Sequence, residues 1–134
     1  MAFVEWRPEF SVGVLEIDAQ HQRLLDIINQ LHDAMKMGSK PAMLAQVVNE
    51  LVGYTRYHFA YEEKLMEAAN YRELEEHRRK HRAMVAQVEG FRDLETSGQA
   101  TVSLKLMAFL KEWLSRHILE TDQRYAGCVA RVKA

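Results

Sequence analysis

The sequence has few of the residues that make turns and crosslinks. Its 134 residues include six glycines, two prolines and one cysteine, Cys128. A β-sandwich or β-barrel needs a turn signal about every 8–12 residues, so this scarcity argues against an all-β fold. One cysteine also excludes a disulfide bond within the chain, which is typical of a reducing compartment. We therefore expect a cytoplasmic protein.

Long hydrophobic runs and a surplus of one charge are also absent. No stretch approaches the ~18 uncharged apolar residues of a membrane span. The first ten residues carry Glu5, Arg7 and Glu9, where a signal peptide has an apolar core. Lysine and arginine total 18 against 19 acidic residues, for a net charge of −1. This balance does not favour nucleic acid or an anionic membrane as a partner, and we expect a monomer that binds neither.

What the chain does have is the composition and periodicity of a helical globular protein. Hydrophobic residues make up 48% of it and charged residues 28%, and a chain of this length is one domain, here 1–134. Apolar residues recur at spacings of three and four, the stripe of a core-facing helix. The stripes predict helices over about 18–37, 41–66, 71–96 and 102–120, preceded by an arm over 1–17 and followed by a tail over 121–134.

Residues at the predicted boundaries support this division. We expect Asp18 to be the N-cap of the first helix and Gly38 to lie just beyond its end, while Pro41 suits the first position of the second helix. Four helices of ~20 residues joined by short breaks favour antiparallel packing. The expected fold is therefore all-α: an antiparallel up-down four-helix bundle with an N-terminal arm and a short C-terminal tail.

Polar, titratable residues occupy stripe positions where leucine is expected. Burying one unpaired polar group costs about 1–3 kcal/mol and a charge costs more, against a total stability of about 5–15 kcal/mol. Metal coordination would compensate for this cost. The residues concerned are His21, His58, Glu62, His77, His81, His117 and Asp122.

Their positions along the predicted helices place these residues at one level. His21 is near the start of the first helix, the pair His58 and Glu62 near the end of the second, the pair His77 and His81 near the start of the third, and His117 near the end of the fourth. In an up-down bundle those four ends meet. The topology therefore gathers the polar residues into one layer.

Spacing supports a shared site but leaves one ligand open. His58 and Glu62 are four residues apart, as are His77 and His81, so each pair lies on one helix face. His117 and Asp122 are five apart, about 140° around a regular helix. Either a π-bulge occurs there or the chain leaves helical geometry before Asp122. On helix geometry alone, Glu120 competes with Asp122.

The donor set indicates two transition-metal ions. Five imidazoles and two carboxylates are too many for one zinc and too rich in nitrogen for calcium or magnesium. Imidazole with carboxylate suits iron, manganese or zinc. If both carboxylates bridge two six-coordinate ions, and an oxide or hydroxide bridges as well, one position on one ion stays open. Such a site suits reversible binding of a small molecule.

In order along the chain, these residues resemble the hemerythrin family in its bacterial single-domain form. The resemblance covers nearly the whole chain. It rests on Trp6, the segment Val14-Leu15-Glu16-Ile17-Asp18-Ala19-Gln20-His21, His58-x-x-x-Glu62, His77-x-x-x-His81 and His117-x-x-x-x-Asp122.

The resemblance implies a non-haem di-iron centre with an oxo or hydroxo bridge. His77, His81 and His117 would bind one iron, and His21 and His58 the other, which keeps the open position. Glu62 and Asp122 would bridge the two irons, so the family pattern prefers Asp122 to Glu120. Dioxygen would bind reversibly at the open iron as hydroperoxide, in an apolar pocket. The residues at the family's pocket positions are Leu24, Phe59, Trp113 and Ile118.

The expected function is therefore dioxygen carriage, storage or delivery, by a binding protein and not an enzyme. Nitric oxide or azide would be related small ligands. A second hypothesis is a module that senses oxygen, redox state or nitric oxide through a separate partner. A third is a di-iron enzyme that consumes peroxide or nitric oxide. The basic run from His77 to Arg82 more simply predicts a solvated helix face than a docking patch.

Overall fold

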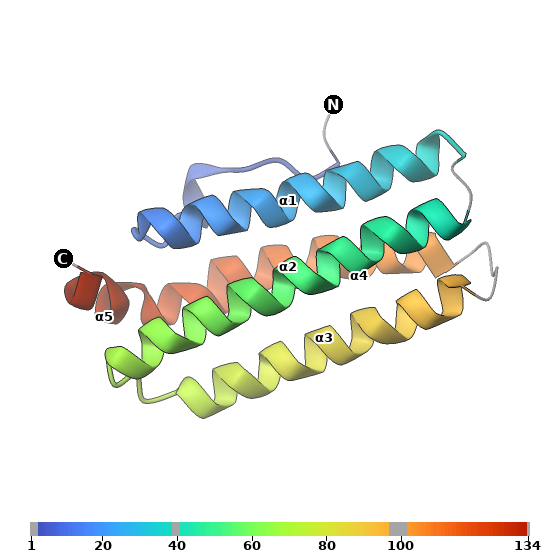
Figure 1. Cartoon of the computed structure of the whole chain (residues 1–134). Coiled ribbons are helices and arrows are strands. Elements are labelled where there is room, and N and C mark those ends of the chain that lie inside the picture. The colour runs from blue at the N-terminus through green and yellow to red at the C-terminus, as the bar shows by residue number, and fades with distance from the viewer. Residues whose placement is uncertain (1–2, 39–40, 97–101, 134) are drawn as a thin grey trace.

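The computed structural model describes residues 3–38, 41–96 and 102–133, and within these ranges the chain is helical, with no strand. Four long helices run side by side (Figure 1). They are α1 (Leu15–Lys36), α2 (Pro41–Ala68), α3 (Leu74–Thr96) and α4 (Val102–Arg116). Parts of the predicted arm, breaks and tail lie outside the described residues, at 1–2, 39–40, 97–101 and 134.

The helices form a closed ring of neighbours. α1 packs on α2, α2 on α3, α3 on α4, and α4 on α1. Helices that follow one another in the chain run in opposite directions, so the start of α1, the end of α2, the start of α3 and the end of α4 meet at one end (Figure 1). The all-α, antiparallel four-helix bundle predicted from the sequence is confirmed.

The first helix begins at Leu15, three residues before the predicted boundary. Asp18 is therefore not its N-cap but lies in its first turn, where its carboxylate accepts hydrogen bonds from the Val12 N–H (2.9 Å) and the Ser11 hydroxyl. These bonds tie the arm to α1, and Gly13 makes the turn between them at φ +76°. Gly38, just beyond the helix, has φ +72°, the left-handed conformation that glycine adopts without strain.

α2 extends two residues beyond the predicted boundary, to Ala68. Asn70 follows the helix and terminates it. Asn70 has φ +54° and its N–H donates to the Glu67 carbonyl, while the Tyr71 N–H donates to the Met66 carbonyl. This pair of bonds is a Schellman motif, with asparagine in the position that glycine usually takes. The motif delays α3 to Leu74, three residues after the predicted start at 71.

The predicted C-terminal tail, residues 121–134, is helical as far as the structure describes it. After α4 comes η2, a π-helix over His117–Asp122, and then α5 over Gln123–Lys133. The fully buried ring of Tyr125 packs among Val12, Val14 and Met66, which anchors α5 between the arm and α2. Tyr125, three positions after Asp122, thus forms the buried face of α5. The periodicity of the sequence did not predict this face.

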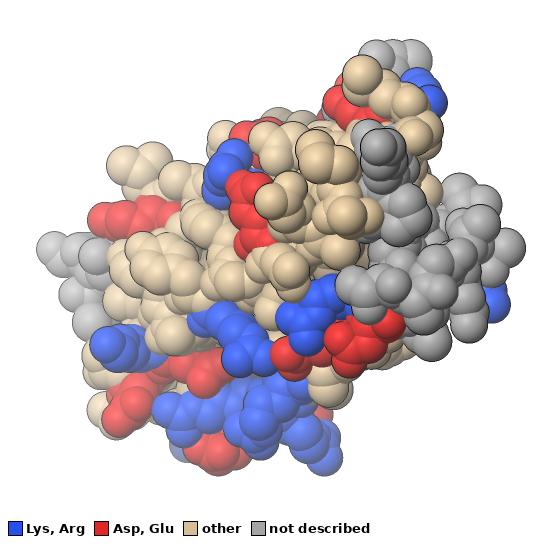
Figure 2. Space-filling model, turned by 45° about the vertical axis from the view of Figure 1, so that its right-hand side comes forward, with Lys and Arg blue, Asp and Glu red and all other residues tan. Residues whose placement is uncertain are grey.

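Charges of both signs share the surface. The basic run on α3 is paired with acids, since Arg78 contacts Glu63, Glu67 and Glu75. Blue and red side chains intermix along the lower edge of the molecule in Figure 2. No helix in the described ranges is long and apolar enough to cross a membrane.

Candidate metal centre

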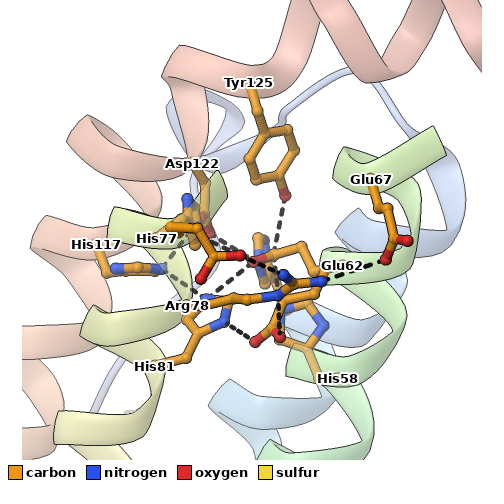
Figure 3. A network of polar contacts seen from close by, with 12 residues as sticks. His58, Glu62, Glu67, His77, Arg78, His81, His117, Asp122 and Tyr125 are labelled. Carbon is orange, nitrogen blue, oxygen red and sulfur yellow. Dashed lines mark hydrogen bonds and ion pairs between the residues drawn. The ribbon is translucent and has the colours of Figure 1, made fainter. Parts of the chain in front are cut away.

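The structure brings together all seven residues that the sequence singled out. α1 contributes His21, α2 contributes His58 and Glu62, α3 contributes His77 and His81, and η2 contributes His117 and Asp122. Each is at most 5% exposed. Figure 3 shows the labelled members converging between the helices from separate elements. The layer lies between the main apolar core and the smaller cluster under α5, because Phe59 of the first stacks on His81 and Tyr125 of the second contacts Glu62.

Donor atoms in this layer form two groups that share Glu62. In one group, ligand atoms of Glu62, His77, His81, His117 and Asp122 all lie within 4.8 Å of one another. In the other, the same holds for His21, His58 and Glu62. Each group is compact enough to surround one ion, and the shared carboxylate would place two such ions side by side.

The two carboxylates divide their oxygens between the groups. Glu62 Oε2 lies 3.0 Å from His58 Nε2 and 3.3 Å from His21 Nε2, whereas Oε1 lies 3.2 Å from the Nε2 atoms of His77 and His81.

Asp122 repeats the pattern. Its Oδ2 lies 3.2 Å from His21 Nε2, and its Oδ1 lies 3.1 Å from the Nε2 atoms of His77 and His117. One oxygen towards each ion is the arrangement that a bridging carboxylate requires. The first group thus has three imidazoles and the second has two.

Hydrogen bonds on the far side of the rings show that the donors fit a cation. The amide oxygen of Gln20 can only accept, so His58 Nδ1 donates to it (2.7 Å). Burial lowers the pKa of His58, and in the neutral ring Nε2 is a bare acceptor facing a carboxylate oxygen. Two acceptors 3.0 Å apart repel each other unless a cation lies between them. Several other atoms of the cluster are buried without a hydrogen-bond partner: both ring nitrogens of His21, Glu62 Oε1, His77 Nε2 and both oxygens of Asp122.

Burial and charge act against each other in this cluster. Burial works to lower the pKa values of His21 and His77, but the carboxylates of Asp122 and Glu62 outweigh it and raise both to about 9. Burial works to raise the pKa of Glu62, yet the facing imidazoles hold it well below its ordinary range. The pKa of Asp122 is lowered as well, because the facing imidazoles outweigh its burial. Both acids therefore remain ionised, and protons on the histidines compete with metal for the same electron pairs.

The π-helix answers the question that the spacing left open. In η2 the backbone bonds run from residue i to i+5, which brings residues five apart onto one face. His117 and Asp122 are both buried and point into the cluster, whereas Glu120 is exposed. The first alternative, a π-bulge, is the one observed.

The aromatic residues expected around a dioxygen pocket cover the three-histidine group. Phe59 stacks on His81 with ring centroids 3.6 Å apart, and Trp113 stacks on His117 at 4.3 Å. Leu24 and Ile118 are almost fully buried in the same apolar cluster. Phe59 also lines a groove of about 420 Å³ between α2 and α3. The two aromatic rings thus cover one side of the polar layer.

Sequence reasoning missed several residues that support the cluster. Tyr125 donates a hydrogen bond to Glu62, His81 Nδ1 donates to Glu63 (2.8 Å), and Gln20 accepts from His58. Tyr125 could have been found, because it lies three residues after Asp122 on the same helical face. Gln20 and Glu63 each adjoin a cluster residue in the sequence, where about 100° of helical rotation gives no periodic signal.

Fold and site together define a class: a four-helix bundle whose helix ends jointly enclose a histidine–carboxylate cluster suited to binding a metal centre. A family model described as "Hemerythrin HHE cation binding domain" matches residues 12–129. The chain belongs to the hemerythrin family.

Relatives and solved structures agree with this assignment. The chain is 38% identical over 129 residues to a "Bacteriohemerythrin" of Pseudomonas aeruginosa, covering 96% of this chain and 83% of that one. It is 32% identical to a "Hemerythrin-like protein" of Naegleria gruberi, over 91% of this chain and 90% of the other. A solved structure titled "Crystal structure of hemerythrin:wild-type" superposes with a TM-score of 0.88 at 28% identity, covering 96% and 99% of the two chains.

Proposed function

We propose that this protein binds dioxygen reversibly at a non-haem di-iron centre and serves in dioxygen carriage, storage or delivery. His77, His81 and His117 would hold one iron, His21 and His58 would hold the other, and Glu62 and Asp122 would bridge them beside an oxo or hydroxo bridge. The observation that carries the proposal is the unequal donor set. Both carboxylates face both groups, but one group has three imidazoles and the other has two. The poorer position therefore has room for one external ligand.

The iron pair, when bound, supplies the electrons that dioxygen binding requires and the position at which the ligand attaches. The protein supplies the surroundings. Phe59 stacks on His81 and also contacts His58 of the two-histidine group, with ring centroids 5.8 Å apart. With Trp113, Leu24 and Ile118 it forms the apolar wall that we assign to the dioxygen pocket. An apolar wall excludes water and stray protons, which favours release of the ligand unchanged.

Charge balance within the cluster supports the same reading. Two ionised carboxylates lie among five imidazoles at nearly zero exposure, so the residues partly neutralise a pair of cations before any ligand arrives. The hydroxyl of Tyr125 fixes one oxygen of Glu62, and the amide of Gln20 fixes the ring of His58. Ligand binding then requires little movement of the protein.

The test is metal analysis joined to an optical titration. Protein loaded anaerobically with ferrous iron should contain two irons per chain. Exposure to dioxygen should produce a visible absorption that disappears when the gas is removed and returns over repeated cycles. One iron per chain, or complete conversion to a ferric form in the first cycle, contradicts the proposal. Steady consumption of peroxide or nitric oxide with an added reductant would instead show an enzyme.

A further inference from the structure

Two histidines, one from each metal position, donate a hydrogen bond through Nδ1, the ring nitrogen that points away from the cluster. The two acceptors differ in charge. His81 Nδ1 donates to the carboxylate of Glu63 at 2.8 Å, in the three-histidine group. His58 Nδ1 donates to the neutral amide of Gln20 at 2.7 Å, in the two-histidine group. The two bonds are almost equal in length, so the difference between them is the charge on the acceptor.

Glu63 is fixed in place by a side chain on the neighbouring helix. Its Oε2 accepts from His81, and its Oε1 accepts from Arg78 Nε at 3.3 Å. Arg78 in turn contacts Glu67 at 3.2 Å and Glu75. Figure 3 shows Arg78 reaching across to Glu67 beside the histidines. With one partner on each oxygen, Glu63 is held in the orientation that accepts the hydrogen bond from His81 Nδ1.

We propose that Glu63 acts as a positioning residue that makes the two metal positions unequal, so that the three-histidine position binds iron first and more tightly. This inference rests on the proposed function. A carboxylate that accepts a hydrogen bond from a metal-bound imidazole makes the ring a stronger donor to the metal and fixes the ring nitrogen that faces the metal. A neutral amide fixes the ring equally well but adds no charge.

The unequal positions give the centre an order of assembly. An ion in the three-histidine position draws Glu62 Oε1 and Asp122 Oδ1 to itself, because both atoms already face His77. The opposite oxygens of the same carboxylates then remain aimed at His21. The first ion thereby arranges the ligands of the second, and the weaker second position is the one that we assign to dioxygen.

The test exchanges the two acceptors. Ferrous ions are titrated anaerobically into the metal-free protein against a coloured ferrous chelator, which yields two stepwise affinities. Glu63→Gln keeps an acceptor but removes its charge, and should weaken the first affinity about 10–100-fold, the usual effect of losing such a partner. Gln20→Glu adds the charge on the other side and should strengthen the second affinity. Glu76→Gln is the matched control, because Glu76 is exposed and pairs with Arg79 on the same helix.

A general loss of structure cannot produce this pattern, because Gln20→Glu is expected to raise an affinity. Circular dichroism of each metal-free variant checks that it folds. In a His58→Ala variant, which disables the two-histidine position, the remaining affinity should still fall when Glu63→Gln is added. If the wild type takes up fewer than two irons, the proposed function fails. If the wild type takes up two irons and binds dioxygen reversibly, but Glu63→Gln leaves both affinities unchanged or weakens both equally, this inference alone is overturned.

Discussion

The hydroxyl of Tyr125 donates a hydrogen bond of 2.8 Å to Glu62 Oε2 (Figure 3). Burial, together with the carboxylates of Glu62 and Asp122, raises the pKa of Tyr125 well above its usual 10, so the hydroxyl keeps its proton. The residues lie 63 positions apart in the chain. The bond therefore joins the last helix directly to the centre of the bundle.

Tyr125→Phe should lower the free energy of unfolding of the metal-free protein by about 1–3 kcal/mol, because it removes a buried hydrogen bond to a charged group. Urea unfolding measures the change. Tyr71→Phe is the matched control, since its hydroxyl binds the partly exposed Glu73 at 3.1 Å, and it should change stability by less than about 0.5 kcal/mol. An equal decrease in the free energy of unfolding in both variants would show that the bond to Glu62 stabilises the protein no more than the exposed one.

Asp122→Asn should reduce the iron content from two per chain to at most one, because a neutral amide is a poor bridge between two cations. Glu120→Gln should leave the content unchanged, since Glu120 is exposed on the other side of the π-helix. Iron is measured by elemental analysis after anaerobic loading and desalting. Loss of iron in Glu120→Gln but not in Asp122→Asn would reverse the assignment.

Raising the pH from about 6.5 to about 9 should lower the melting temperature of the metal-free protein. The pKa values of His21 and His77 are raised to about 9 in the fold, against about 6.5 in the unfolded chain. These two histidines therefore bind more protons in the folded state in this window. The stability that they contribute is fully present below about pH 6.5 and is lost as the pH rises through about 9.

Ferrous iron should reverse this trend, because imidazole must lose its proton to bind metal. The gap between the melting temperatures of the loaded and metal-free protein should widen from pH 6.5 to 9. Parallel thermal unfolding curves at several pH values, read by circular dichroism, test both statements. A constant gap would mean that metal and protons do not compete for these rings.

Phe59→Ala should destabilise the protein by about 3–5 kcal/mol, the usual cost of truncating a core phenylalanine. It should also speed the irreversible conversion of the iron-loaded protein to the ferric form, because the ring covers one face of His81 beside the groove that both residues line between α2 and α3. Urea unfolding and the decay of the visible absorption in air measure the two effects.

Tyr57→Ala is the control for this change, since Tyr57 lies on the same helix and is 57% exposed. It should leave both stability and decay rate close to those of the wild type. If Phe59→Ala loses stability without faster decay, the ring is a packing residue and does not shield the centre from water.

Much of the fold and of the cluster could be predicted because both depend on helical periodicity. Stripes at spacings of three and four identify the helices, and short breaks make them antiparallel. That topology alone places the start of α1 beside the end of α2, so His21 and His58 are expected at one level. The prediction weakened where periodicity ends: Asp18 looked like a helix cap but binds the arm, and the last segment looked like a tail but forms α5.

The sequence by itself determined the helices, their order and six of the seven cluster residues, because these depend on local spacing along the chain. Spacing left Asp122 in competition with Glu120, and only the family resemblance preferred Asp122. Only the tertiary structure decided which carboxylate oxygen faces which histidine, that the backbone widens into a π-helix before Asp122, and that Glu63 and Gln20 lie behind two of the rings. These features depend on rotamers and on the packing of one helix against another. Neighbours in the sequence set neither the rotamers nor the helix packing. Both are determined when four helix ends meet around one buried layer.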